Sequence, residues 1–247
     1  MSGDNKNSFQ RFNIHHRIQH VLMFTSFIVL TVTGLPIKYD YTNWAKTATS
    51  IFGGFDTMFS IHLAGAAVML FSSVYHLFYL IVYPVVTKKM SWGTLPGPRD
   101  IKDLLHNLQY FIGLKKDQPK FGRYSYKEKF DYWAVFWGMF IMGGSGLMMW
   151  FPQIFASYLP RWVIDSARYA HSDEAMLAII AIFVWHFYNV HFSPNFFPMN
   201  FVWLHGKMSR KEMEYEHPLE LEKIDRKQSS NSSNITHLKK GTKDNSV

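Results

Sequence analysis

The sequence has no cysteine among its 247 residues. This absence excludes a disulfide framework, a zinc or iron–sulfur site with cysteine ligands, a catalytic thiol, and haem attached covalently through a CxxCH motif. Acidic residues are also few, with 18 Asp and Glu against 26 Lys and Arg, which leaves a formal charge of +8. Such a surplus is typical of proteins that bind nucleic acid or face a membrane surface, so the placement of the charges decides between the two.

Four stretches carry almost no charge and are long enough for a transmembrane helix, which needs roughly 20 residues. They are residues 18–36, 57–86, 130–150 and 174–192. All four are of helix length, and in lipid a helix satisfies its own backbone hydrogen bonds. The sequence therefore predicts an all-α integral membrane protein built as a bundle of four transmembrane helices.

The basic residues are unevenly distributed among the segments outside these stretches. Three precede the first stretch, ten lie between the second and the third, and nine follow the fourth, whereas the other two connections hold four in all. Lys and Arg concentrate on the cytoplasmic side of membrane proteins. We therefore expect a multi-pass protein of a bacterial-type cytoplasmic (inner) membrane, with both termini cytoplasmic. The positive charge reflects topology, and no nucleic-acid partner is expected.

The composition outside the spans predicts three further regions. Residues 1–17 are expected to form a cytoplasmic N-terminus, the membrane domain covers 18–192, and residues 193–216 follow it as a membrane-proximal cytoplasmic segment. Residues 217–247 are rich in Ser, Asn and Lys, a composition typical of a mostly disordered tail.

The long connection between the second and third stretches contains one amphipathic pattern. Residues 100–114 place six apolar side chains on one helical face, namely Ile101, Leu104, Leu105, Leu108, Phe111 and Ile112. This predicts a cytoplasmic amphipathic helix, lying either on the membrane surface or against a partner protein.

Five histidines occupy special places in the spans: His20, His62, His76, His171 and His186. Ionisable side chains inside a membrane are costly and are usually functional. The second and fourth spans each carry two of them, 14 and 15 residues apart, so each pair stays within roughly 60° of one helix face. Because these two spans run in the same direction, His62 is expected level with His171, and His76 with His186.

Two helices that offer imidazole at two matched depths are what two b-type haems with paired histidine ligands require. The glycines of the spans would leave room for the porphyrin edges. The alternative is that the histidines only hydrogen-bond to neighbouring helices, and that the glycines only allow close helix packing.

Several motifs occur in a characteristic order along the chain. They are Arg17-Ile-Gln-His20 with Thr33-Gly34-Leu35-Pro36, residues 122–129 (GRYSYKEK) with Tyr132-Trp133, residues 145–150 (SGLMMW), and the span from His171 to His186-Phe187-Tyr188. Together they resemble the di-haem cytochrome b subunits of respiratory formate dehydrogenases and nickel–iron hydrogenases. The closer likeness is to the thiosulfate-reductase-like cytochrome b/b6-domain branch. The resemblance covers about residues 9–220.

The resemblance implies that His62 and His171 ligate the iron of one non-covalent b haem near the outer face, and that His20 and His186 ligate a second near the inner face. Spacing alone instead pairs His76 with His186, so five histidines compete for four ligand positions. The histidine left over would belong to a quinone site. A third haem that also recruits His191 is a further alternative.

The resemblance also implies an electron-transfer subunit of an oxidoreductase complex, which connects the pool of quinone or menaquinone, an exchangeable substrate, to a partner redox subunit. Quinone would bind near the inner haem, where the candidates at the inner span ends are Arg17, His20, Tyr126, Lys129, Asp131, Asn189 and His191. Because a chain without cysteine holds no iron–sulfur cluster or c-type haem, we expect the partner to be a separate multihaem cytochrome c or iron–sulfur/molybdenum protein. The rival interpretation is a haem-free membrane anchor or small transporter with structural histidines.

Overall fold

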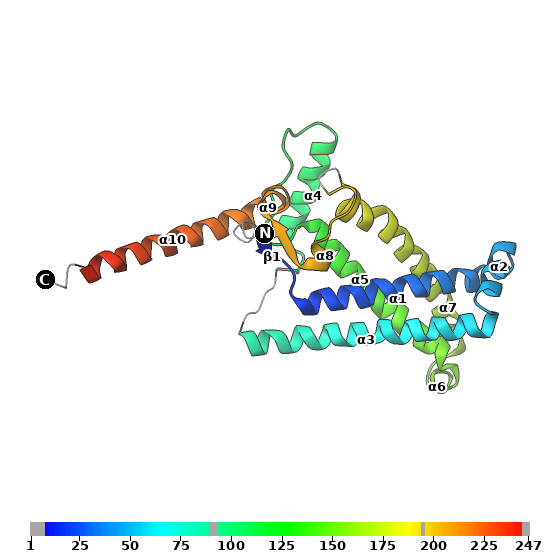
Figure 1. Ribbon diagram of the computed structural model, residues 1–247. Coiled ribbons are helices and arrows are strands. Elements are labelled where there is room, and N and C mark those ends of the chain that lie inside the picture. The colour runs from blue at the N-terminus through cyan, green and yellow to red at the C-terminus, as the bar shows by residue number, and fades with distance from the viewer. Residues whose placement is uncertain (1–7, 89–92, 194–195, 244–247) are drawn as a thin grey trace. The chain divides into compact units, whose positions relative to one another are not determined.

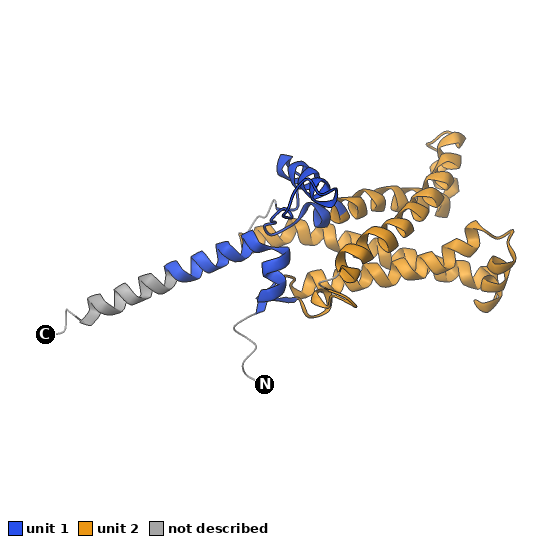
Figure 2. Ribbon diagram, turned by 90° about the horizontal axis from the view of Figure 1, so that it is seen from above, with its two compact units in different colours: residues 1–10, 92–130, 207–247 blue, residues 11–91, 131–206 orange. Residues whose placement is uncertain are grey.

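The structure is a computed structural model that describes residues 8–88, 93–193 and 196–243, with side chains described as far as residue 230. It divides into two compact units, coloured separately in Figure 2. Unit 1 comprises residues 1–10, 92–130 and 207–247, and unit 2 comprises residues 11–91 and 131–206. Each unit is described by itself.

Four helices are long and apolar enough to cross a membrane, as the sequence predicts. They are α1 (Ile14–Lys38), α3 (Phe55–Thr87), α5 (Tyr126–Trp150) and a fourth that covers Arg161–Phe192 and begins as α7 (Arg161–Ile180). At most 22% of the most apolar window of any of them is buried inside the protein. Such exposed apolar side chains are expected of helices surrounded by lipid. The all-α, four-span fold is thus confirmed.

The spanning helices extend beyond the apolar stretches, most of all at the start of the fourth. We expected that span to begin at residue 174, whereas α7 begins at Arg161, directly after Pro160. Its first turns are polar and include the i,i+4 pair Arg161–Asp165, with 3.7 Å between Nε and Oδ2. Hydropathy detects only the part of a helix that lies in lipid, and polar turns that project beyond it carry no such signal.

In unit 2, α1 and α3 run side by side and antiparallel (Figure 1), joined through the short helix α2 (Asn43–Ile51). Gly65 allows the close approach, because a Cβ at this position would come within 3.0 Å of Val29. The end of α1 is tied to α7 by Lys38, whose ammonium group contacts the Ser172 hydroxyl and lies 3.2 Å from Asp173 Oδ1. Two further short helices, α6 (Pro152–Ala156) and α8 (Val202–His205), follow the third and fourth spans.

The fourth span changes its hydrogen-bonding pattern midway, a feature the sequence analysis did not predict. Beyond Ile180 it continues as two π-helical segments, η2 (Ala181–His186) and η3 (Tyr188–Phe192). A π turn holds an additional residue and therefore turns the following side chains back by roughly 100° relative to an unbroken α-helix. Viewed down the helix axis, an unbroken α-helix would place His186 roughly 60° from His171. With one π turn between them, the angle is roughly 40° in the opposite sense.

Unit 1 comprises the elements formed by the polar segments outside the spans. Strand β1 (Ser8–Gln10) pairs antiparallel with β2 (Lys207–Ser209), and α4 (Pro98–Phe111) confirms the amphipathic helix expected in the long connection. Helix α9 (Arg210–Glu216) begins at a capping box in which Ser209 and Glu212 satisfy each other's backbone N–H groups.

The tail differs from its expected disorder, because helix α10 covers Pro218–Lys243. Pro218 is the first residue of the helix, a position whose N–H has no partner within the helix, so its missing N–H costs no hydrogen bond. Asp225 then binds Arg210 of α9 with 2.5 Å between Oδ2 and Nη2, and Glu222 and Arg226 form an i,i+4 pair. These local ion pairs were not visible in the composition. Residues 244–247 of the expected tail lie outside the described residues.

Candidate functional site

His62 of α3 is held by the end of α1. Thr33 Oγ1 donates to the Val29 carbonyl at 2.7 Å and lies 2.9 Å from His62 Nδ1. If the hydroxyl hydrogen is used on the carbonyl, Nδ1 carries the imidazole hydrogen and donates to Thr33. Gly34 makes room for the ring, since a Cβ there would come within 3.1 Å of His62 Cε1.

His171 of α7 is held in the same way by α5. Its Nδ1 lies 3.1 Å from Ser145 Oγ and 3.2 Å from the Met142 carbonyl, which only accepts, so Nδ1 again carries the hydrogen. A Cβ on Gly146 would come within 3.2 Å of His171 Cε1. A hydroxyl residue followed by glycine thus supports a histidine of the neighbouring helix twice in unit 2.

His62 lies within electrostatic range of His171. Among the described residues, neither His62 Nε2 nor His171 Nε2 makes a hydrogen bond. A neutral imidazole with its hydrogen on an anchored Nδ1 presents the lone pair of Nε2, which is the usual state of a metal-ligating histidine.

A second group of histidines in unit 2 comprises His20 of α1 and His186 of η2. His186 Nδ1 lies 3.1 Å from Asp131 Oδ2 on α5, so a carboxylate takes the place of the hydroxyl groups at the first pair. His20 of α1 interacts electrostatically with His186 and with His191. Its ring packs against Phe24 and Trp203 at centroid distances of 5.9 and 5.8 Å. Within the described part of the chain, the buried His20 Nδ1 has no hydrogen-bond partner.

His76, the rival of His20 in the sequence analysis, is engaged at both ring nitrogens. Its Nδ1 lies 2.9 Å from Gln19 Oε1, and its Nε2 lies 3.2 Å from Tyr132 Oη. Spacing along the helices pairs His186 with His76. In the structure His20 lies within electrostatic range of His186, and His76 contacts Gln19 and Tyr132. Spacing along one helix fixes depth but not which neighbouring helix is closest, and α1 supplies His20 at that depth.

His191 is buried beside the second pair. Its ring centroid is 6.4 Å from that of His186, and its Nδ1 accepts a hydrogen bond from the Asn200 backbone N–H at 3.3 Å. His191 Nδ1 is thus occupied by a local backbone hydrogen bond, while its ring packs against that of His186.

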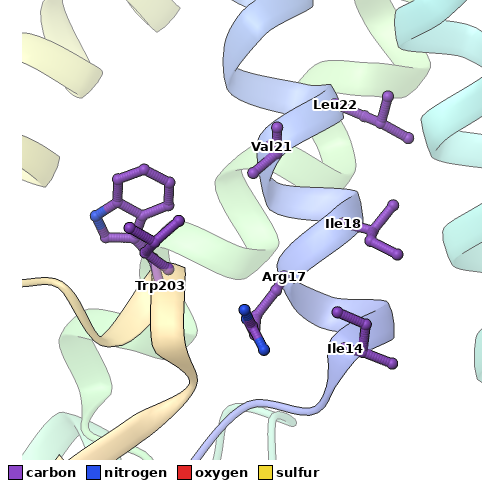
Figure 3. A pocket seen from close by; sticks show the side chains of 7 residues that line it. Ile14, Arg17, Ile18, Val21, Leu22 and Trp203 are labelled. Carbon is purple, nitrogen blue, oxygen red and sulfur yellow. The ribbon is translucent and has the colours of Figure 1, made fainter.

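The other residues expected at a quinone site are distributed over both units. Arg17 lines a hollow of about 220 Å³ beside Trp203 (Figure 3), and its Nε is buried without a hydrogen-bond partner among the described residues. Asn189 donates its amide to the Trp185 carbonyl at 2.9 Å. In unit 1, Tyr126 accepts a hydrogen bond from Asn107, and Lys129 forms an ion pair of 2.9 Å with Asp100.

The donor set fits b-type haem held between two imidazoles. Iron in such a haem needs one nitrogen from each side, and the structure offers His62 and His171, whose Nε2 atoms make no hydrogen bond within the described chain, with a glycine beside each ring. Over the described residues, no group of three or more His, Asp or Glu side chains gathers to hold a metal ion in another way.

Sequence reasoning did not single out the supporting residues Thr33, Ser145 and Gln19. A signal for the first two was present, because Thr33-Gly34-Leu35 and Ser145-Gly146-Leu147 repeat a hydroxyl–Gly–Leu pattern near the same ends of two spans. Gln19 had no such signal, since only the packing of α1 against α3 brings it to His76.

Comparison with known proteins gives two findings. A family model described as prokaryotic cytochrome b561 matches residues 11–197, which include all four spans and the histidines described above. The chain is also 26% identical over 141 residues to the cytochrome b556(Fdn) subunit of nitrate-inducible formate dehydrogenase from Escherichia coli K12, and equally to its counterparts in E. coli O157:H7 and Shigella flexneri. The match covers 55% of this chain and 62% of each relative, so the chain spans less than two thirds of their length.

Proposed function

The chain belongs to the prokaryotic cytochrome b561 family, and we propose that it is a di-haem subunit that passes electrons across the membrane between a quinone and a partner redox protein. Family membership makes it a multi-pass membrane cytochrome b that transfers electrons in a bacterial inner membrane. The observation that carries the finer proposal is the presence of two histidine pairs at opposite ends of one four-helix unit.

In this proposal His62 and His171 hold one haem, and His20 and His186 hold the other. Bound b-type haem supplies one-electron redox chemistry that no side chain of this protein supplies. The chain's own part is to fix the ligands: Thr33 and Ser145 keep the Nδ1 hydrogens of the first pair in place, and Asp131 does so for His186. Such supporting contacts set the orientation and basicity of the ligand.

The two pairs are separated along the membrane normal by the helices themselves. On α1, His20 and the Thr33 that supports His62 are 13 residues apart, which corresponds to roughly 20 Å of helix. Two centres at these depths would divide the bilayer into short electron-transfer steps, which a single centre would not do.

Quinone is proposed to react at the His20/His186 end, since quinone chemistry moves protons together with electrons. Groups that can exchange protons lie there. Asp131 contacts His186, and His76 and Tyr132 are hydrogen-bonded to each other, with His76 also bound to Gln19, the neighbour of His20 in the sequence. At the His62/His171 end the supporting groups are hydroxyls, which stay protonated. By the distribution of Lys and Arg, the His20/His186 end faces the cytoplasm.

The partner is proposed to be a separate redox chain at the other membrane face. The absence of cysteine means that this chain contributes no iron–sulfur cluster or c-type haem of its own. Its relatives are named as subunits of formate dehydrogenase, which favours an iron–sulfur/molybdenum partner, while a multihaem cytochrome c would meet the same need.

Haem content of single-histidine variants tests the assignment. The purified protein should show b-type bands in the reduced-minus-oxidised spectrum and contain about two haems per chain. Alanine at His62, His171, His20 or His186 should lower the content to about one, whereas His76→Ala, the matched control on α3, should keep two. A folded but colourless protein would favour the haem-free anchor. Loss of haem in His76→Ala with full haem in His20→Ala would favour the pairing by spacing.

The quinone assignment needs a separate measurement on variants that keep both haems. His76→Ala and Tyr132→Phe should slow haem reduction by a menaquinol analogue, and a larger solvent deuterium effect than in the native protein would assign the loss to proton transfer. Unchanged reduction rates in both variants would place the quinone elsewhere.

A further inference from the structure

Helix α4 of unit 1 packs through its polar side. Asn107 is buried at 3% exposure and donates its amide to Tyr126 Oη at 2.8 Å. Asp100 is paired with Lys129 at 2.9 Å, and only 16% and 17% of these two side chains are exposed. Burial raises the pKa of Asp103, which lies on the same side of the helix. An amphipathic helix of a globular protein is expected to pack through its apolar side, so α4 is oriented in the reverse sense.

The apolar side of α4 is correspondingly open. Its large side chains are between 47% and 66% exposed, namely Ile101, Leu104, Leu105, Leu108 and Phe111. The row continues past the end of the helix with Ile112 at 63% and Leu114 at 71%. A continuous apolar row of this length on one helix face is typical of a surface that another apolar phase covers.

The position of α4 in the chain limits what covers it. Thr87, the last residue of α3, and Tyr126, the first residue of α5, lie on either side of α4 in the sequence and belong to two membrane-spanning helices. Within unit 1, Asn107 and Asp100 contact Tyr126 and Lys129 in the first turn of α5, so α4 lies beside the end of a membrane-spanning helix.

The charges around the apolar row match anionic lipid headgroups. Residues 99–129 contain eight Lys and Arg against four Asp and Glu. Arg99 and Lys102 lie on α4 itself, and Lys115 and Lys116 follow it directly. Helices that lie in the membrane interface combine an apolar face with flanking cations, and their binding grows with the anionic lipid content.

We propose that α4 lies in the membrane interface, with its apolar row among the acyl chains and its flanking Lys and Arg side chains on anionic phospholipid headgroups. This inference rests on the four-span fold and on the packing within unit 1, and it does not depend on the haem assignment. It selects the lipid surface over a protein partner because a bilayer is adjacent by connectivity and carries the complementary charge.

The absence of native cysteine allows a direct test in the full-length protein. Single substitutions Leu104→Cys, Leu105→Cys and Leu108→Cys place a spin label on the apolar row, and Lys102→Cys and Gln109→Cys are matched controls on the same helix. Each labelled protein is reconstituted alone into nanodiscs of phosphatidylcholine with phosphatidylglycerol. Collision rates with oxygen and with a water-soluble nickel chelate are then measured by electron paramagnetic resonance.

Labels on the apolar row should have a collision rate with the nickel chelate at least about threefold lower than that of the control labels. Their collision rate with oxygen should be higher. Shielding should weaken in nanodiscs of phosphatidylcholine alone, and equal shielding there would overturn the role of anionic headgroups. Equal nickel contact at all five positions would overturn the proposal. Shielding that arises only after a partner protein is added would replace it with the protein-docking alternative.

Discussion

The two histidine pairs of unit 2 differ in what supports them. At the His62/His171 pair, both rings rest on a hydroxyl residue followed by glycine. At the His20/His186 pair, one ring is bound by the Asp131 carboxylate, while the other has a buried Nδ1 without a partner among the described residues. The first pair is nearly symmetric and neutral, whereas the second is asymmetric and includes a charge.

Under the proposed di-haem function, this difference would give the two ends of the unit different tasks. Neutral hydroxyl and carbonyl supports orient a ligand histidine without adding a charge beside it. A carboxylate on a ligand raises its basicity and can couple the centre to protons. This contrast is the basis for proposing quinone chemistry at the His20/His186 end and electron relay at the His62/His171 end.

The largest expected effect comes from filling the space beside the neutral pair. Gly34→Val or Gly146→Val would place a side chain within 3.1 or 3.2 Å of a ring carbon, which must then move off the haem axis. Haem content should fall from about two to about one per chain. Gly144→Val is the matched control on α5, because a Cβ there meets nothing within 4 Å. Equal haem loss in all three variants would mean that the glycines serve helix packing in general.

A smaller effect is expected when the charge is removed from the other pair. Asp131→Asn should keep both haems and raise the midpoint potential of one, because the carboxylate stabilises the ferric state. A hydrogen bond to a charged group is worth about 1 kcal/mol more than a neutral one, which corresponds to about 40 mV for one electron. A redox titration followed optically should show a shift of that order in a single component. An equal shift of both components would contradict the separation of the two pairs.

Removal of the neutral supports should shift potentials still less. Thr33→Val and Ser145→Ala each delete one uncharged hydrogen bond to a proposed ligand histidine. The midpoint potential of the haem proposed at His62 and His171 should therefore change by less than half the shift expected for Asp131→Asn. Thr33→Ser retains the hydroxyl and serves as the control. If either deletion moved the same component as Asp131→Asn, the assignment of supports to pairs would be wrong.

The smallest effect is expected outside both pairs, at the Arg210–Asp225 contact of unit 1. The Arg210 guanidinium lowers the pKa of Asp225. The contact therefore stabilises unit 1 at pH values above the usual aspartate range and is lost as the pH falls through the lowered pKa. Asp225→Asn should slightly increase proteolysis of the tail at neutral pH, with no difference in strong acid, and should leave both haem spectra unchanged. A haem shift in this variant would connect the two units functionally.

Much of this arrangement follows from local sequence patterns. The four spans were predictable because an apolar run of 20 residues has few stable alternatives in lipid. Histidines inside those runs were noticeable because they are costly there. The polar start of α7 and the helical tail were not predicted, because contacts such as Arg161–Asp165 and Arg210–Asp225 stabilise helices without any hydropathy signal.

The sequence by itself determined the class of the protein: four membrane helices, five intramembrane histidines, and no thiol to bind a cluster or a c-type haem. The tertiary structure decided which histidines meet. His20 of α1 lies within electrostatic range of His186 on the fourth span, while Gln19 and Tyr132 contact His76. Helix period and rise fix direction and depth along one helix, but partner choice depends on how neighbouring helices pack, and only the folded chain contains that information.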